Sequence, residues 1–339
     1  MTESQRVKKV KMNDSQNKIA VTVITGFLGA GKTNFINSVL KKYPDVQFAL
    51  VENEFGDVSI DTKLIKGLDA SQMFELRQGC ICCTISNEFE LVLQELAERF
   101  PNVEHLLIET TGIADPALVI RPFFRDESLQ LIYQFNGTVC LVDAINFEKS
   151  TEKEITIKQI VVADLIVVSK SEQLSDIQKV TFKENLRTVN PFAEIQFTQF
   201  AGSDFLAPFG SCPDSLSGSL GGRELFKHHS LQSKKRSVFN FVSTSNSHTH
   251  LLAKTLQFNQ PLNREQFTEW LAYTLDLNKT EIYRVKGILC FENELYDYIL
   301  QGVGGSFEME EGSDLSSELK SEIVFIGNLQ GLNLNFKTG

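Results

Sequence analysis

The sequence predicts an α/β fold in which a doubly wound, mostly parallel sheet is followed by a smaller α+β domain. Two observations lead to this fold class. Up to about residue 200, short apolar and β-branched runs alternate with helical patterns, and this alternation is typical of a parallel sheet with helical crossovers. Beyond a stretch rich in Gly, Ser and Pro at 208–222, one helical pattern lies among several strand-like runs, which indicates a compact α+β unit.

The length of the chain also favours two domains. A single hydrophobic core rarely grows past roughly 250–300 residues, and this chain has 339. We therefore expect four segments: a disordered basic tail (1–18), a first domain (19–207), a linker (208–236) and a second domain (237–339).

The expected elements follow from the apolar periodicity of each segment. The first domain should contain strands at 21–24, 46–51, 103–108, 138–142, 164–168 and 194–198, and helices at 34–41, 87–100 and 175–189. The second should contain strands at 238–242, 251–257, 283–291, 295–302 and 322–326, and a helix at 264–275. In such a sheet the ligand should lie at the carboxyl ends of the parallel strands.

The most informative stretch follows the first strand and matches the complete phosphate-binding loop pattern, Gly-x-x-x-x-Gly-Lys-Thr. It consists of Gly26, Phe27, Leu28, Gly29, Ala30, Gly31, Lys32 and Thr33. The glycines let backbone N–H groups turn toward phosphate oxygens, Lys32 adds a cation near the β- and γ-phosphates, and the Thr33 hydroxyl can bind Mg²⁺. A strand before the loop and a helix after it argue against a chance match, so we predict a nucleoside triphosphate site.

Acidic residues follow two other strands of this sheet. Glu109-Thr110-Thr111-Gly112 has the Walker B arrangement, in which the carboxylate orients Mg²⁺ or the attacking water and the Gly112 N–H senses the γ-phosphate. Glu54 and Asp57 lie in a polar segment after the second strand, which we expect to be a loop near Mg²⁺ and its waters. An ordinary solvated acidic loop explains either of these two residues equally well. His105 lies in mid-strand and is expected to be structural.

Three of the 6 cysteines crowd into Cys80-Ile81-Cys82-Cys83, in a polar stretch after a glycine. Thiolates are soft ligands, and two or three of them with a His, a carboxylate or a water would make a tetrahedral Zn²⁺ site. On extended backbone Cys80 and Cys82 would share a face, with Cys83 turning with the chain. The alternatives are a redox or metal-free thiol cluster and core packing. His248 and His250 could lend a ligand, although surface histidines are the simpler interpretation.

The composition excludes some classes of partner. A net charge of −10 and a pI near 5.2 argue against nucleic acid as the main partner. The sequence has no apolar run long enough to span a bilayer and no signal-peptide pattern, so we expect a cytoplasmic protein that does not contact a membrane. Clustered thiols also suit a reducing compartment better than a disulfide framework.

Together these segments resemble the CobW-like family of metal-trafficking P-loop GTPases. The resemblance rests on TGFLGAGKT, ENEFGDVSID, GCICCT, IETTGIADP and the C-terminal RVKGIL, ILQGVGG and IVFIGN, which span most of residues 20 to 328. It implies a P-loop GTPase domain followed by a CobW-like C-terminal domain, slow hydrolysis of GTP, and a metal held by Cys80, Cys82 and Cys83 for delivery to a client protein. By the same match Glu109 is the Walker B acid, which would act with Lys32 and Thr33. Some members resemble zinc chaperones and others serve cobalt or iron enzymes, so Co²⁺ or Fe²⁺ could replace Zn²⁺.

The guanine-reading motif departs from the family pattern. Relatives usually carry Asn/Thr-Lys-x-Asp, and this chain has Ser169-Lys170-Ser171-Glu172. Lys170 can still lie along the base and Glu172 can still accept from guanine N1 and N2. Because Glu172 is one methylene longer than Asp and Ser169 is shorter than Asn, we expect a weaker preference for guanine. The chain also lacks the long His-rich stretch of some members, which disfavours metal storage.

The sequence therefore predicts a GTP-hydrolysing metallochaperone, for Zn²⁺ first, that uses Mg²⁺, cycles between GTP and GDP and serves a client metalloprotein. The cysteines lie between the two segments that should feel the γ-phosphate, so hydrolysis could change metal affinity. A dimer that depends on nucleotide or metal is compatible with this prediction. The rivals are a regulator or scaffold that assembles a metalloenzyme without carrying metal, and a small-molecule kinase, for which no acceptor pocket is evident.

Overall fold

The computed structural model describes residues 18–54, 57–61, 81–147, 153–197, 251–315 and 320–336. Within 52–61 and 81–88 it describes the backbone alone. Residues 1–17 of the expected tail, the expected linker, the strand at 238–242, and His248 and His250 lie outside these ranges. No helix in the described part of the chain is both long and apolar enough to cross a membrane.

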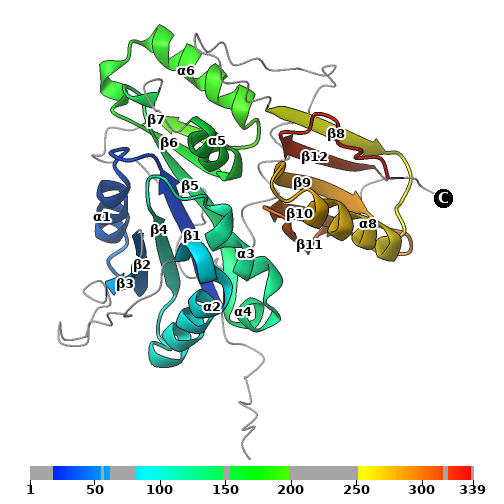
Figure 1. Ribbon diagram of the computed structural model, residues 1–339, viewed down its shortest axis with the longest axis horizontal. Coiled ribbons are helices and arrows are strands. Elements are labelled where there is room, and N and C mark those ends of the chain that lie inside the picture. Colours follow the sequence, from blue (N-terminus) through cyan, green and yellow to red (C-terminus); the bar gives the residue numbers. More distant parts are fainter. Residues whose placement is uncertain are drawn as a thin grey trace, which may run out of the picture.

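A seven-stranded sheet forms the first domain (Figure 1). Its strands, in spatial order, are β3 (Asp57–Asp61), β2 (Phe48–Glu54), β4 (His105–Thr110), β1 (Ile19–Gly26), β5 (Tyr133–Asp143), β6 (Leu165–Ser169) and β7 (Glu194–Phe197). Every neighbouring pair is parallel except β2 and β3. The predicted doubly wound α/β sheet and its six expected strands are confirmed.

The acidic segment after β2 differs from the prediction. β2 runs on to Glu54, and β3 begins at Asp57 and pairs with it in antiparallel register, so Glu54 and Asp57 belong to a hairpin and not to an open loop. The prediction was wrong because polar residues ended the apolar run that marks the strand. Backbone pairing at the open edge of a sheet needs no apolar side chains, since it satisfies the N–H and C=O groups themselves.

Helices cover both faces of this sheet. Phe35, Ile36 and Val39 of α1 (Lys32–Lys42) pack on one face. The other face carries α2 (Ile81–Arg99), α3 (Ala117–Arg125), α5 (Lys153–Val162) and α6 (Asp176–Val189), and the short helix α4 (Glu127–Ile132) leads into β5.

Three of these helices were not expected: α3, α4 and α5. α3 contains Pro122, which usually breaks a helix, and α5 is apolar and β-branched around most of its circumference. Six of the ten residues of α5 are buried, so its apolar side chains are not confined to one stripe and its periodicity gives little signal.

The start of α2 also differs from the prediction. The helix begins at Ile81 and not near residue 87, so Cys82 and Cys83 lie in a helical turn and not on extended backbone. The helical pattern that predicted this element consists of Phe89, Val92, Leu93 and Leu96, which all lie beyond the cysteines. The first turn therefore carried no apolar repeat from which its conformation could be read.

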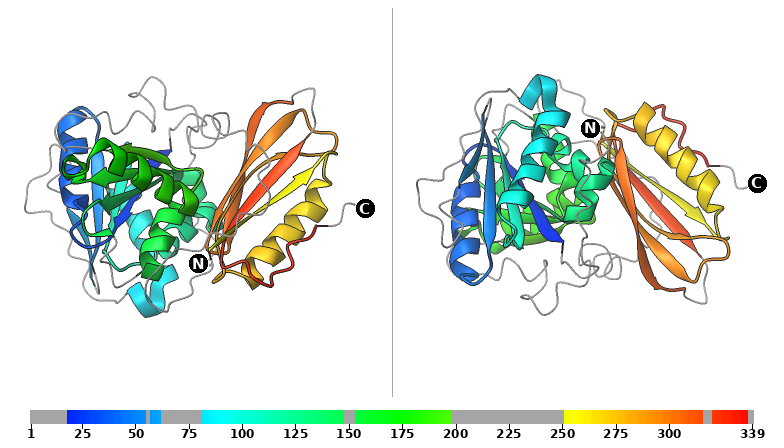
Figure 2. Two further views of the ribbon diagram at one scale, coloured as in Figure 1. Left: turned by 90° about the horizontal axis from the view of Figure 1, so that it is seen from above. Right: turned by 90° about the horizontal axis from the view of Figure 1, so that it is seen from below.

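The second domain is a five-stranded antiparallel sheet with one helix. Its strands, in spatial order, are β11 (Ser306–Asp314), β10 (Tyr296–Val303), β9 (Ile282–Cys290), β12 (Ser321–Gly327) and β8 (Leu252–Phe258). Helix α8 (Arg264–Leu277) packs Phe267, Leu271 and Leu275 on one face, and Figure 2 shows the opposite face turned toward the first domain. The α+β prediction is confirmed. β11 was missed because its glutamates interrupt the apolar alternation.

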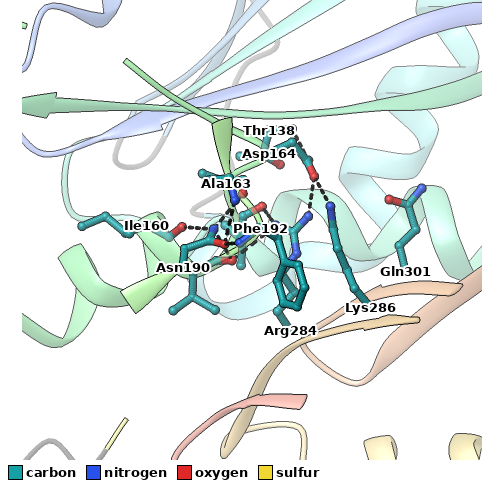
Figure 3. Close-up of polar contacts among 12 residues, drawn as sticks. Thr138, Ile160, Ala163, Asp164, Asn190, Phe192, Arg284, Lys286 and Gln301 are labelled. Carbon is teal, nitrogen blue, oxygen red and sulfur yellow. Dashed lines mark hydrogen bonds and ion pairs between the residues drawn. The ribbon is translucent and has the colours of Figure 1, made fainter. Parts of the chain in front are cut away.

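A buried carboxylate joins the two sheets. Asp164 lies directly before β6, where its Oδ1 accepts from Lys286 Nζ at 2.7 Å and from Arg284 Nη2, and its Oδ2 accepts from the Thr138 N–H at 2.9 Å (Figure 3). Arg284 also donates to the Val161 carbonyl at 3.3 Å and to that of the following residue, at the end of α5. Burial alone would raise the pKa of Asp164, but the two cations outweigh it and hold that pKa below its usual range.

The side chain of Asn190 also binds the end of α5. Its Nδ2 donates to the carbonyls of Ile160, Val161 and Ala163 at 2.7, 3.1 and 2.8 Å (Figure 3). Its Oδ1 accepts from the backbone N–H groups of residues 192 and 193. The end of α5 is therefore held by a fully buried side chain from the first domain and by Arg284 from the second.

We expect the carboxylate of Asp164 and the ammonium of Lys286 to contribute very differently to the free energy of unfolding. Asp164→Asn should lower the free energy of unfolding by about 3–5 kcal/mol, because it leaves two buried cations without a counter-ion. Lys286→Met should change it by about 1 kcal/mol or less, because Arg284 still pairs with Asp164 and an ammonium no longer has to be desolvated. Denaturant unfolding followed by the fluorescence of Trp270, the single tryptophan, measures both. Equal losses in the two variants would show that the carboxylate requires both cations.

Candidate nucleotide-binding site

The order of the strands gathers the predicted nucleotide residues at one edge of the large sheet. β1 lies between β4 and β5, with Ile24 opposite Glu109 and Gly26 opposite Leu141. β6 lies next to β5, with Asp143 opposite Ser169. Since all four strands are parallel, the phosphate loop, the Walker B acid and the expected base motif follow carboxyl ends that lie side by side, as predicted.

The phosphate loop depends on glycine at the points where its backbone turns. Gly26, Gly29 and Gly31 have φ values of +136°, +77° and +96°, which residues with a Cβ rarely adopt. At Gly26 a Cβ would also lie 2.3 Å from the Leu141 carbonyl oxygen. Gly31 is the N-cap of α1, which has no side-chain cap and no acidic residue in its first turn. The first N–H groups of α1 therefore form a positive end suited to a phosphate.

Lys32, Thr33 and Glu109 lie together at this edge. Lys32 is buried, and its Nζ donates to the Gly26 carbonyl at 3.0 Å, so the cation is folded over the loop. Burial lowers the pKa of Lys32, while the nearby Glu109 acts in the opposite direction. Thr33 Oγ1 donates to Glu109 Oε1 at 3.4 Å. The arrangement offers an ammonium for phosphate oxygens beside a hydroxyl and a carboxylate, which are oxygen ligands for a hard cation.

Gly112 brings the segment after β4 against the phosphate loop. A Cβ at Gly112 would lie 2.5 Å from the Leu28 nitrogen and 2.9 Å from its Cα, so no larger residue fits without moving the loop. The side chain of Leu28 itself is exposed. The two segments that should contact a triphosphate therefore touch through their backbones.

The expected base motif surrounds an ion pair. Lys170 lies just after β6 with φ +55°, and its Nζ is 2.6 Å from Asp143 Oδ2. Ser169 is buried and donates to the Val142 carbonyl at 3.4 Å, whereas Glu172 is exposed in the following turn. Lys170 and Glu172 thus differ sharply in how firmly they are held.

Asp143 was not among the predicted site residues. Besides Lys170, it accepts from the backbone N–H groups of Ile145 and Asn146 and from Asn146 Nδ2, at 2.9, 3.1 and 2.9 Å. Burial would raise the pKa of Asp143, but these hydrogen bonds outweigh it and hold the pKa below its ordinary value. The only sequence signal for Asp143 was an acidic residue at the end of a predicted strand. Its position opposite Ser169, next to Lys170, comes from the pairing of β5 with β6.

The remaining predicted residues have different outcomes. His105 is structural as expected: it is buried, its Nε2 lies 2.9 Å from Thr22 Oγ1, and burial lowers its pKa to about 4. Cys80 lies outside the described residues, and only the backbone of Cys82 and Cys83 is described. Among the side chains that the structure describes, no group of three His, Cys, Asp or Glu residues could hold a metal. The cysteine site stays a prediction, as do the roles of Glu54 and Asp57.

Two family descriptions match separate parts of the chain. Residues 20–197 match the CobW/HypB/UreG nucleotide-binding domain, and residues 253–335 match the cobalamin synthesis protein cobW C-terminal domain. The chain is 30% identical over 317 residues to the zinc chaperone YjiA of Escherichia coli (strain K12), covering 92% of this chain and 94% of that protein. It is 27% identical over 353 residues to the zinc-regulated GTPase metalloprotein activator 1 of Schizosaccharomyces pombe, covering 94% and 84%. The crystal structure of the Zn(II)-bound YjiA GTPase from E. coli superposes with a TM-score of 0.60 and 26% identity, over 92% of this chain and 94% of that one.

The contact between Gly112 and Leu28 can be tested with one methyl group. Gly112→Ala should weaken nucleotide binding by about tenfold or more, because the new Cβ would displace the Leu28 backbone and distort the phosphate loop. Titration with a fluorescent nucleotide measures this affinity. Gly287→Ala is the matched control, since its Cβ would lie 2.7 Å from a backbone oxygen in the small sheet, away from the nucleotide edge. Equal affinity in the parent and in Gly112→Ala would mean that the contact does not shape the site.

Proposed function

The chain is a GTPase of the CobW/HypB/UreG family, and on that premise we propose that it is a metallochaperone that transfers Zn²⁺ to client metalloproteins under the control of GTP hydrolysis. The observation that carries the proposal is the close contact of Gly112 with Leu28. It occurs in a chain whose relatives, matched over more than nine-tenths of its length, are named zinc chaperone and zinc-regulated GTPase metalloprotein activator. Through this contact the segment after Glu109 would respond directly to the contents of the phosphate loop.

The triphosphate would be held by the chain's own charges. The loop residues Gly26 to Thr33 surround the phosphates with N–H groups, and Lys32 stabilises the charge that grows on the transferring phosphoryl group. Glu109 would orient the attacking water, and the Gly112 N–H would meet the γ-phosphate. Thr33 and Glu109 fit Mg²⁺, because they bring a hydroxyl and a carboxylate within 3.4 Å of each other; when bound, the ion would neutralise phosphate charge.

Guanine would be read by Ser169, Lys170 and Glu172. Lys170 is held along the edge of the sheet by Asp143 at 2.6 Å, so its aliphatic stem offers a fixed surface for the base. Glu172 is exposed at the following turn and would accept from guanine N1 and N2. These two roles support GTP as the substrate. Discrimination of guanine from adenine would depend on Glu172, whose side chain is long and exposed.

Zn²⁺ would be bound by Cys80, Cys82 and Cys83, whereas Glu54 and Asp57 would lie near Mg²⁺ and its waters. A short link, residues 100–104, joins the end of α2 to the start of β4, so the helix and the strand run in opposite directions. The first turn of α2 and the Glu109 end of β4 therefore face the same edge of the sheet. This topology supports coupling between cysteine ligands and nucleotide. Zn²⁺ suits thiolates best, and Co²⁺ or Fe²⁺ are the alternatives.

The remaining features of the proposal follow from this chemistry. Cysteines must stay reduced to exchange a metal, so the chaperone would act in the cytoplasm. The partner is a client metalloprotein, and a dimer that forms with nucleotide or metal would be consistent with the same switch. We retain the division into a tail (1–18), a GTPase domain (19–207), a linker (208–236) and a C-terminal domain (237–339).

The metal site is tested by chelator competition for Zn²⁺, with GDP and with a non-hydrolysable GTP analogue. The parent should hold one Zn²⁺ whose affinity differs between the two nucleotides, and Cys82→Ser with Cys83→Ser should weaken it by roughly two orders of magnitude or more, because a hydroxyl replaces a thiolate poorly. Cys290→Ser, which removes a buried thiol from the small domain, is the control and should bind Zn²⁺ like the parent. A parent without stoichiometric metal would contradict the proposal and favour an assembly factor that carries none.

The base preference is tested by competition between GTP and ATP. The parent should prefer GTP, Glu172→Asp should strengthen that preference, and Glu172→Ala should remove it, since the charge-assisted hydrogen bonds to guanine depend on the carboxylate. Glu184→Ala removes an exposed carboxylate from α6 and should leave the preference unchanged. If the parent binds ATP and GTP equally well, Glu172 does not read the base.

A further inference from the structure

Helix α5 contains a buried side chain that the nucleotide chemistry described above does not use. Gln159 has no exposed surface, and its Nε2 donates to the carbonyls of Gly112 at 3.1 Å and Ala114 at 3.2 Å. Its Oε1 is buried without a hydrogen-bond partner among the described residues. The side chain is therefore held on the segment after β4 by two donated bonds alone, although burying an unpaired amide oxygen is costly.

The same helix contacts the second domain. Lys158 Nζ lies 3.6 Å from Asp115 Oδ2, and 5.3 Å from the centre of the Tyr283 ring in β9. At the end of α5 the carbonyls of Val161 and Val162 accept from Arg284, also in β9. In Figure 1, α5 lies on the side of the large sheet that is nearest the small sheet. One helix of ten residues thus touches both the segment 112–115 and β9.

We propose that α5 links the nucleotide site to the C-terminal domain, and that Gln159 is a positioning residue that holds Gly112 where its N–H meets the γ-phosphate. Gly112 has little freedom, because it lies against the Leu28 backbone. A shift of Gly112 on loss of the γ-phosphate breaks or realigns both bonds from Gln159. The shift is passed along α5 to Tyr283 and Arg284. By linkage, the position of the small sheet in turn biases the site toward GTP or GDP.

A purely structural role for Gln159 makes a different prediction. If its two bonds only satisfy carbonyls in the core, removing them weakens the fold and affects both nucleotides equally. If they position Gly112, removing them weakens GTP selectively, because GDP has no γ-phosphate for Gly112 to meet. The ratio of the two affinities therefore separates the roles, whereas stability does not.

The test is Gln159→Met, which keeps the length of the side chain and removes its donor. We expect the affinity for a non-hydrolysable GTP analogue to fall by about tenfold and kcat for GTP to fall, with GDP affinity unchanged within about twofold. Ile160→Val is the matched control, since Ile160 is buried at the next position of α5, in the apolar cluster with Leu186 and Val189; its affinity ratio should equal that of the parent. Equal losses for GDP and analogue in Gln159→Met, or no loss for either, would overturn the proposal.

A second variant tests the far end of the link. Tyr283→Leu removes the half-buried ring beside Lys158 without touching the nucleotide edge, and it should also lower the analogue-to-GDP affinity ratio, by about threefold or more. With Gln159→Met already present, adding Tyr283→Leu should lower the ratio little further, because the path is already broken. Independent, additive effects of the two changes would contradict a shared path. The experiment rests on the GTPase activity and involves no metal, so it can fail while the zinc measurement succeeds.

Discussion

The close approach of Gly112 to the backbone of Leu28 is the constraint on which the rest of the site depends. A side chain at Gly112 would meet the Leu28 nitrogen at 2.5 Å, so the phosphate loop and the segment after Glu109 can touch only because residue 112 is glycine. That contact exists because β1 pairs directly with β4, which sets Ile24 opposite Glu109. The contact between Gly112 and Leu28 therefore depends on both the strand order and the glycine. Through it, a change of bound nucleotide would shift the segment after Glu109.

The second domain is attached to the first through buried charge. Asp164 forms ion pairs with both Lys286 and Arg284, and Arg284 also donates hydrogen bonds to carbonyls at the end of α5. Such a group costs desolvation energy that a packed apolar interface would avoid, so its value lies in orientation more than in stability. A fixed orientation of β9 on α5 is what coupling requires, since two elements transmit a shift only if their contacts are specific. Helix α5 contacts both sets of residues: Gln159 binds the Gly112 carbonyl, and Arg284, which pairs with Asp164, binds the carbonyl of Val162.

Much of the fold could be read from the sequence, and the omissions have physical causes. The phosphate loop, the Walker B strand and helices such as α6 and α8 have strong local patterns, and the structure has them where expected. α5 was missed because most of its residues are buried, which leaves no single apolar stripe to mark the helix. Asp143 and Gln159 were missed because their roles come from pairing across the sheet and between elements. The cysteine motif was recognised by composition, but the helical turn that carries Cys82 and Cys83 has no apolar repeat to reveal it.

We infer that the segment after Glu109 and helix α5 respond together to the γ-phosphate. Amide hydrogen exchange measured with GDP and with a non-hydrolysable GTP analogue, each at saturation, tests it most directly. We predict that the analogue slows exchange, relative to GDP, both in residues 110–116 and in residues 153–162. Slower exchange confined to the phosphate loop, residues 26–33, with identical exchange in α5, would contradict a joint response.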